Sequence, residues 1–194
     1  MPRRTGSRCS TAIEVSPSTD RLHVVTGPPG SGKSTLIAAL ARAGVATSEE
    51  VGRRIIREQV AVGGSALPWG DERAFAELMA PREVAAHAAA LASGRTVVLD
   101  RGVPDVVGFL RASCLPVPPA IDAAARATRY NARVFLAPFW RDIFVQDAER
   151  PQSADSAQAS EAVLRETYRD YGYTVVDLPR ASVADRVAFV TARL

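Results

Sequence analysis

Two kinds of segment alternate along this chain. Short apolar runs rich in β-branched residues are bounded by turn residues, as is typical of buried strands. Between them lie longer segments in which apolar residues recur at every third or fourth position, which predicts amphipathic helices. The predicted strands are 22–26, 96–99, 133–136 and 174–178, with a short additional strand at 45–48. The predicted helices are 35–43, 49–61, 71–93, 104–112, 121–130, 160–171 and 182–194. Strands that alternate with helices indicate parallel crossovers, so we expect an α/β doubly wound fold with a five-stranded, mostly parallel sheet covered on both faces.

Two segments fall outside this alternation. Residues 1–20 are polar and without apolar periodicity, and we interpret them as a disordered tail before a single domain at 21–194. The segment 137–157 is polar and contains Pro138 and Pro151, so we expect a loop there. A length of 194 residues with 47% hydrophobic and 23% charged residues is ordinary for one globular domain.

Charge and cysteine content narrow the class of protein. The net charge of +3 is too small to favour nucleic acid as a partner. Cys9 and Cys114 form no metal-ligand spacing, so neither a disulfide scaffold nor zinc is expected. The chain has no apolar run of membrane-spanning length and no apolar block of a secretory signal near its start. We therefore expect a cytoplasmic protein, a monomer or a homodimer.

The strongest chemical signal follows the first predicted strand. The sequence GPPGSGKS matches the pattern GxxxxGK[ST] and lies between a strand and a helix, as a phosphate-binding loop requires. Its glycines allow backbone N–H groups to face phosphates, Lys33 reaches the β- and γ-phosphates, and the Ser34 hydroxyl is a ligand for Mg²⁺. The expected cofactors are ATP, or GTP, with Mg²⁺. The residues expected to bind the nucleotide are Gly27, Pro28, Pro29, Gly30, Ser31, Gly32, Lys33, Ser34 and Thr35.

Lys33 is also the only lysine of the chain, and all other Lys+Arg positions are arginine. Lysine has been retained where a compact ammonium on a flexible stem is needed and a planar guanidinium does not serve. This supports a catalytic role for Lys33.

Charged residues follow two other predicted strands. Asp100 ends the apolar run VVLD, which would bring its carboxylate to the edge of the sheet beside the phosphate loop. There it would be a catalytic base, a ligand for Mg²⁺, or both. The neighbouring Arg101 is a candidate for binding substrate or phosphate. After the short strand at 45–48, Glu49, Glu50 and Arg53 are candidates for binding the acceptor, or simply the charged start of a helix.

The segment PFWRDIFVQDAER combines aromatic and charged residues after a strand. A loop of this kind can close over a nucleotide and supply Arg141 or Arg150 to the phosphoryl group. The alternative is a surface loop whose aromatic side chains pack on the core.

The order of these motifs resembles a known family. GPPGSGKST, EEVGRRIIREQ, VVLDRGVPD, DAERPQSADSAQ, YRDYGYTVVDLP and SVADRVAFV together resemble the AAA-type predicted ATPases, P-loop proteins similar to the kinase domain of bacterial nicotinamide riboside kinases. The resemblance covers 22–194. It implies a P-loop NTPase with a nucleoside-kinase-like three-layer fold, a lid that includes 147–150, a nucleoside triphosphate and Mg²⁺. It also implies phosphate and metal roles for Lys33 and Ser34, and an acid at Asp100.

The leading hypothesis is a kinase that transfers the γ-phosphoryl group of Mg-ATP to a hydroxyl of a small-molecule acceptor, such as a nucleoside, a cofactor precursor or an antibiotic. The alternative is a regulatory ATP- or GTP-binding protein with weak hydrolysis that acts through a protein or lipid partner. A conventional GTPase is disfavoured because its guanine-selecting NKxD element needs a second lysine. A mechanical ATPase and a polynucleotide kinase are weaker alternatives.

Overall fold

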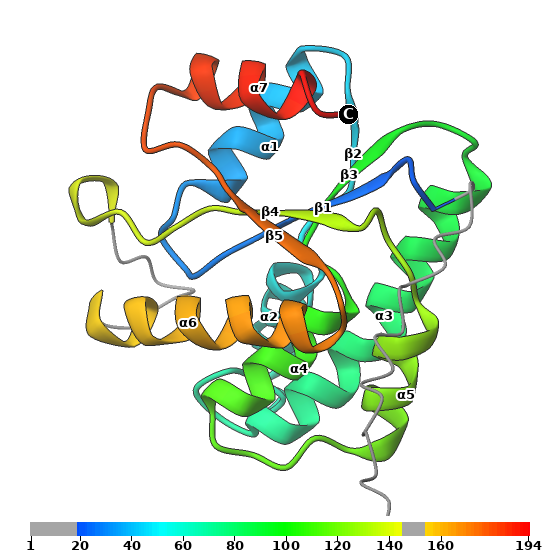
Figure 1. Ribbon diagram of the computed structural model, residues 1–194. Coiled ribbons are helices and arrows are strands. Elements are labelled where there is room, and N and C mark those ends of the chain that lie inside the picture. Colours follow the sequence, from blue (N-terminus) through cyan, green and yellow to red (C-terminus); the bar gives the residue numbers. More distant parts are fainter. Residues whose placement is uncertain (1–18, 145–153) are drawn as a thin grey trace, which may run out of the picture.

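The computed structural model describes residues 19–144 and 154–194, which form one sheet between two layers of helices (Figure 1). The strands are β1 (Leu22–Thr26), β2 (Ala46–Thr47), β3 (Val97–Asp100), β4 (Arg133–Leu136) and β5 (Thr174–Asp177). They lie in the order β2-β3-β1-β4-β5, and every pairing is parallel. The predicted five-stranded α/β sheet is confirmed, and it is wholly parallel.

Successive residues of the central strands face opposite layers. Leu22 and Val24 of β1 belong to one apolar core, whereas Val25 belongs to the other. In β3, Leu99 and Val98 divide between the two cores in the same way. Since both faces of the sheet are buried, the strands read as continuous apolar runs in the sequence.

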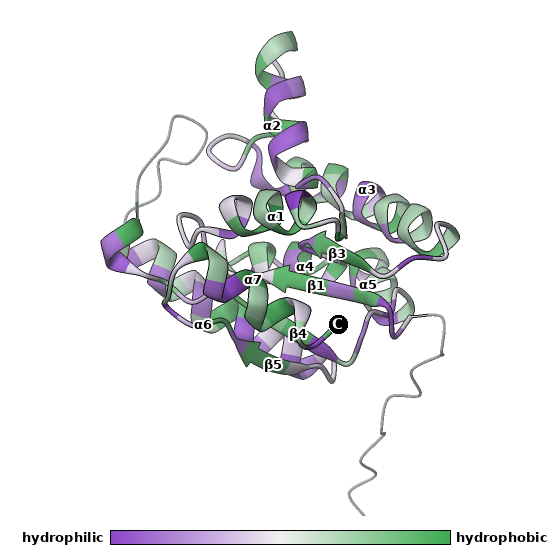
Figure 2. Ribbon diagram, turned by 90° about the horizontal axis from the view of Figure 1, so that it is seen from above, coloured by the Kyte–Doolittle hydropathy of each residue, from purple (hydrophilic) through white to green (hydrophobic). Residues whose placement is uncertain are grey.

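The helices are α1 (Lys33–Arg42), α2 (Val51–Val62), α3 (Glu72–Ala92), α4 (Val103–Ala112), α5 (Pro119–Ala127), α6 (Ala154–Asp170) and α7 (Val183–Thr191). A short 3₁₀ helix, η1, occupies Arg141–Ile143. Helices α1 and α7 cover one face, and α3, α4, α5 and α6 cover the other (Figure 1). Helix α2 packs on α3 at its start, and its far end extends away from the rest of the molecule (Figure 2). None of the described helices combines the length and apolar character needed to cross a membrane.

Several helix boundaries differ from those predicted. Helix α1 begins at Lys33, two residues before the predicted start, because Gly32 adopts a left-handed conformation and ends the loop there. Helix α5 begins at Pro119, since proline fits the first turn of a helix.

The expectation of a loop over 137–157 is wrong at its end, because α6 already includes 154–157. The sequence ADSAQA has no apolar periodicity, but alanine and glutamine are good helix formers. Residues 145–153, which include 147–150 of the expected lid, lie outside the described residues.

The last residues of the predicted tail belong to the domain. The carbonyl oxygen of Thr19 accepts a hydrogen bond from the backbone N–H of Leu22, and that of Asp20 accepts one from the Asn131 side chain. The domain therefore includes these two residues, while 1–18 lie outside the described residues.

Candidate active site

The loop at 27–32 joins β1 to α1 and requires glycine at specific positions. Gly27 has φ = 139°, and a Cβ there would lie 2.3 Å from the carbonyl oxygen of Ala137. Gly30 and Gly32 have φ values of 73° and 76°, in the left-handed region. The loop leads into the N-terminus of α1, where unpaired backbone N–H groups and the helix dipole favour an anion. The sequence, its position between strand and helix, and its conformation together define a phosphate-binding loop.

Lys33 is the first residue of α1, and its side chain folds back over the loop. Its Nζ atom donates hydrogen bonds to the carbonyl oxygens of Gly27 and Pro28, at 2.8 and 2.7 Å, and to Oγ of Ser31 at 3.3 Å. The ammonium group is therefore held above the loop. Ser34 and Thr35 follow in the same turn and are exposed, so their hydroxyls are available to a ligand at the loop.

A buried arginine that the sequence analysis did not select lies against the same loop. Arg186 of α7 is 4% exposed, and its Nη2 atom donates a hydrogen bond to the carbonyl oxygen of Ser31 at 3.3 Å. Its Nη1 atom lies 2.9 Å from where a Cβ on Gly32 would be. No carboxylate of the described residues forms an ion pair with it. Burial lowers the pKa of Arg186, as expected for a cation that is removed from water without an anionic partner.

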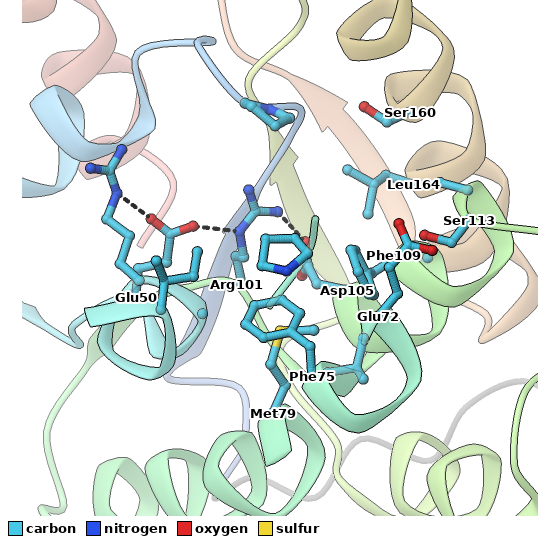
Figure 3. Close-up of a pocket in the computed structure, with 18 of the residues that line it drawn as sticks. Glu50, Glu72, Phe75, Met79, Arg101, Asp105, Phe109, Ser113, Ser160 and Leu164 are labelled. Atoms are coloured by element: carbon cyan, nitrogen blue, oxygen red, sulfur yellow. Dashed lines mark hydrogen bonds and ion pairs between the residues drawn. The ribbon is translucent and has the colours of Figure 1, made fainter. Parts of the chain in front are cut away.

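Next to the loop is a cavity of about 290 Å³, the size of a site for one small molecule. Charged side chains form one wall and apolar side chains another (Figure 3). The lining residues are Pro29, Glu50, Gly52, Arg53, Ile56, Pro68, Glu72, Phe75, Met79, Glu83, Arg101, Asp105, Val106, Gly108, Phe109, Ala112, Ser113, Ser156, Ser160 and Leu164. Since Pro29 belongs to the phosphate loop, the loop and the cavity share a boundary.

A chain of ion pairs forms the charged wall (Figure 3). Arg101 donates from Nε to Oε1 of Glu50 at 3.0 Å and from Nη1 to Oδ1 of Asp105 at 2.9 Å. Arg53 donates to the other oxygen of Glu50 at 3.1 Å. Burial disfavours the charge on Arg101, but Glu50, Asp105 and Asp100 outweigh this effect and raise its pKa. Two arginines and two carboxylates are thus fixed at the side of the cavity.

Asp105 fixes this wall to the rest of the fold. Besides Arg101, its carboxylate accepts hydrogen bonds from Oγ1 of Thr26 at 2.6 Å, the backbone N–H of Gly102 at 3.0 Å and the hydroxyl of Tyr168 at 2.5 Å. Thr26 is the last residue of β1 before the phosphate loop. Asp105 therefore connects the loop, α4 and α6 through one buried carboxylate.

Asp100 occupies a different place from Glu50. It ends β3, opposite Val25 of β1, so the sheet places it at the carboxyl edge beside the strand that leads into the phosphate loop. Its backbone N–H donates to Oγ of Ser48, and its side chain is 4% exposed. Asp100 is not among the residues that line the cavity.

The donors available for Mg²⁺ suit a nucleotide-bound ion. Mg²⁺ prefers oxygen ligands and keeps several waters or phosphate oxygens rather than a full set of protein ligands. The Ser34 hydroxyl and the Asp100 carboxylate supply such oxygens from neighbouring elements. No group of three or more His, Cys, Asp or Glu side chains that could hold a metal ion occurs in the described part of the chain.

The apolar wall comes mainly from one face of α3 together with α4. Phe75 of α3 and Phe109 of α4 lie edge to face, with ring centroids 5.4 Å apart. Met79 and Glu83 continue the α3 face at helical spacing and also line the cavity. Phe75, Met79 and Glu83 were not predicted as site residues, although their four-residue spacing indicates that they share one face of a helix.

The remaining predicted site residues are dispersed. Glu49 is exposed and forms an ion pair with Arg57. Arg141 is exposed in η1 and lines a separate hollow with Arg165, Arg169 and Arg180. Arg150 lies outside the described residues. The structure therefore joins Glu50, Arg53 and Arg101 in one wall and leaves Glu49 and Arg141 elsewhere.

The fold and the loop together define a P-loop protein with the architecture of nucleoside kinases. A family model described as "AAA domain" matches residues 22–186, and the chain belongs to this family. No curated protein matches the chain in a sequence search.

Solved structures share this fold at low sequence identity. A NadR protein in complex with NR is similar with a TM-score of 0.69 and 18% identity, over 90% of this chain and 51% of the NadR chain. Deoxyadenosine kinase from M. mycoides, with dCMP and dCDP, is similar with a TM-score of 0.62 and 13% identity, over 89% of this chain and 97% of that chain. A NadR protein with NAD and AMP-PNP has a TM-score of 0.68 at 17% identity, over 90% of this chain and 49% of that one. The chain thus spans about half the length of the NadR chains that it matches.

Proposed function

We propose that this protein is a phosphotransferase that moves the γ-phosphoryl group of Mg-ATP to a hydroxyl group of a nucleoside-like small molecule. The observation that carries the proposal is the cavity beside the phosphate loop, with Glu50 and Arg101 fixed on its wall. A nucleotide switch does not require a second site for a small molecule beside its phosphate loop. The similar structures support the proposal, because those proteins are in complex with NR, with dCMP and dCDP, or with NAD and AMP-PNP.

Glu50 is the residue best placed to act as the general base. It is 8% exposed, caps the start of α2 and lines the cavity, and both of its oxygens are fixed by arginines. A base must come within hydrogen-bonding distance of the hydroxyl that it deprotonates. Glu50 meets this condition for an acceptor inside the cavity, which makes it the better candidate for the base, whereas Asp100 at the end of β3 suits the metal.

Each of these groups has a distinct role in the proposed transfer step. The acceptor hydroxyl gives its proton to Glu50, and its oxygen forms a bond to the γ-phosphorus as the bond to the β–γ bridging oxygen breaks. ADP leaves with that oxygen. Lys33 and the loop stabilise charge on the phosphates, and Arg101 orients Glu50. When bound, Mg²⁺ would neutralise phosphate charge, with Ser34 and Asp100 as its protein ligands.

We propose that the phosphoryl donor is ATP, and GTP is tested as a second donor. The experiment incubates the full chain with Mg²⁺ and either nucleotide, alone and with nucleosides, riboside cofactor precursors and aminoglycosides. The release of the nucleoside diphosphate, ADP or GDP, is measured. We expect release that depends on one class of acceptor.

Variants at two neighbouring glutamates distinguish loss of the catalytic base from loss of a surface charge. Glu50→Gln removes the base but keeps a side chain of the same size, and we expect a loss of about 10²–10⁴-fold in turnover. Glu49→Gln is the matched control, because its side chain points to solvent and pairs with Arg57. Saturable nucleotide binding without acceptor-dependent release would contradict the proposal and favour a regulatory nucleotide-binding protein. Equal losses in the two variants would contradict the role of Glu50.

A further inference from the structure

We propose that Glu83 selects the acceptor, by hydrogen bonding through its carboxyl group to an amide-type edge of a planar ring that lies along Phe75 and Phe109. An amide-type edge is one in which a hydrogen-bond acceptor lies beside an N–H donor, as in a primary carboxamide or in cytosine. This inference rests on the proposed function, and it adds which part of the acceptor the enzyme recognises.

Glu83 is a buried carboxyl without a hydrogen-bond partner among the described residues. It is 3% exposed, it lies on the cavity-facing side of α3, and it lines the cavity. Among the described residues none donates a hydrogen bond to it, whereas Asp105 accepts four. A buried polar group without a partner costs free energy, and such groups in native proteins call for an explanation. A bound molecule that reaches Glu83 would supply the missing hydrogen bonds.

The surroundings of Glu83 favour the uncharged acid. Burial raises its pKa well above the ordinary value, and Asp105 raises it further. Asp100 and Glu50 act in the same direction, and only Arg101 opposes them. The hydroxyl of Tyr130 is buried nearby and itself has a raised pKa, so it stays uncharged and adds no negative charge.

An uncharged carboxyl carries one O–H donor next to one carbonyl acceptor. This pair matches an amide-type edge with two hydrogen bonds, one in each direction. An acceptor whose ring ends in a carboxylate would instead bring a further negative charge to a wall that already holds Glu50, Asp100 and Asp105.

The apolar residues explain why the recognised group belongs to a planar ring. Phe75, Phe109, Met79 and Ile56 are apolar residues that line the cavity. Aromatic side chains favour stacked or edge-on contacts with another ring. The cavity volume of about 290 Å³ accommodates one such ring with an attached sugar. The hydroxyl end of the acceptor then faces Glu50 and the phosphate loop.

The experiment compares probes that differ only at the ring edge. Nicotinamide riboside and nicotinic acid riboside carry a carboxamide and a carboxylate on the same ring and sugar, and cytidine offers an amide-type edge on another ring. Binding is measured by calorimetry in the absence of nucleotide, and kcat/KM is measured with Mg-ATP. The proteins are the full chain, Glu83→Gln, Glu83→Ala and Glu77→Gln, which changes an exposed glutamate on the same helix.

We expect the wild type to prefer the carboxamide over the carboxylate at least tenfold in both measurements. Glu83→Gln keeps a donor beside an acceptor, so the preference should change by less than threefold. Glu83→Ala should lower kcat/KM for the carboxamide about tenfold or more and reduce the preference. Glu77→Gln should behave as the wild type. As the pH rises and Glu83 loses its proton, the wild type should bind the carboxamide more weakly, because the O–H donor is lost, while binding by Glu83→Gln should not change.

The two proposals fail in different ways. If a probe is phosphorylated but Glu83→Ala leaves the carboxamide preference unchanged, the role of Glu83 is wrong and the kinase proposal stands. If the probes bind with a preference that depends on Glu83 and none is phosphorylated, the recognition is supported and the kinase proposal is wrong. The inference would be overturned if the wild type bound neither of the two ribosides and did not bind cytidine.

Discussion

The phosphate loop and the acceptor cavity lie side by side but are built in opposite ways. The loop is one continuous segment whose backbone conformation and single lysine carry its chemistry. The cavity takes its side chains from α2, α3, α4, α6 and the segment after β3, which are far apart in the sequence. The loop is suited to any nucleoside triphosphate, because its backbone contacts recognise phosphate. Under the proposed function, specificity for the acceptor therefore resides in the cavity, where side chains differ in charge and shape.

The two regions also differ in charge balance. Against the loop lie Lys33 and Arg186, and Arg186 has no carboxylate partner among the residues described. In the cavity, Glu50, Asp105 and Glu83 lie around Arg101. Excess positive charge favours a polyanion, whereas the paired charges of the cavity wall suit a neutral acceptor. Substitutions that alter one region and not the other test this division.

The largest effect is expected at Lys33. Lys33→Ala should reduce turnover about 10³-fold, because it removes the cation held above the loop. Lys33→Arg keeps the charge but not the compact ammonium, so it should be nearly as impaired. The measurements are turnover and thermal unfolding of both variants. An arginine variant with wild-type turnover would contradict the explanation for the retained lysine.

Replacing Asp105 should lower the stability of the whole fold rather than impair one site alone. Asp105→Asn weakens a buried carboxylate that accepts hydrogen bonds from four groups, and we expect a loss of about 3 kcal/mol in the free energy of unfolding. Urea unfolding measures this loss. Tyr168→Phe removes only one of the four partners and should cost about 1 kcal/mol. Equal, small losses in both variants would show that Asp105 does not connect the two regions.

Asp100 and Glu50 should differ in their response to Mg²⁺. Asp100→Asn should raise the Mg²⁺ concentration needed for half-maximal turnover by about 10-fold or more, comparable to losses seen when metal sites are weakened. Glu50→Gln should lower turnover without changing that concentration. Titration of Mg²⁺ at saturating ATP distinguishes them, and the reverse pattern would exchange the two roles.

Arg186 should have opposite effects on stability and nucleotide binding. Arg186→Met removes a buried charge that has no anionic partner in the part of the chain that the structure describes, so the free protein should unfold at a higher temperature. The same change should weaken ATP binding about tenfold, or about 1.4 kcal/mol. Thermal unfolding with and without ATP measures both quantities. Arg193→Met, near the end of the chain, is the control, and a parallel change in both quantities would contradict the role of Arg186.

The smallest effect concerns Glu83 and pH. Because its pKa is raised in the folded protein, the folded state retains a proton that the unfolded chain releases above about pH 4.5. This group therefore lowers stability as the pH rises from there towards its pKa in the folded protein. Glu83→Gln removes that dependence, so its unfolding temperature relative to the wild type should increase between pH 5 and pH 8. An unchanged difference across this range would mean that Glu83 is charged in the folded protein.

Much of the fold followed from the sequence, and only part of the site did. Strands 22–26 and 133–136 were predicted with their observed bounds, because runs buried on both faces leave a continuous apolar signal. The phosphate loop was equally direct, since its residues are contiguous. Glu83 and Phe109 could not be assigned a role in this way, because only the packing of α3 against α4 brings them to one cavity. Arg186 lies more than 150 residues from Ser31, whose carbonyl oxygen it contacts, and no local pattern marks such a pair.

The central claim is that phosphoryl transfer joins the two regions. The most direct test incubates the protein with Mg²⁺ and ATP that carries ¹⁸O at the γ-phosphate, together with nicotinamide riboside or cytidine, and follows the label by mass spectrometry. The account predicts label in a phosphate ester of the acceptor, abolished in Lys33→Ala and strongly reduced in Glu50→Gln. Label found only in inorganic phosphate, at a rate that no acceptor alters, would contradict it.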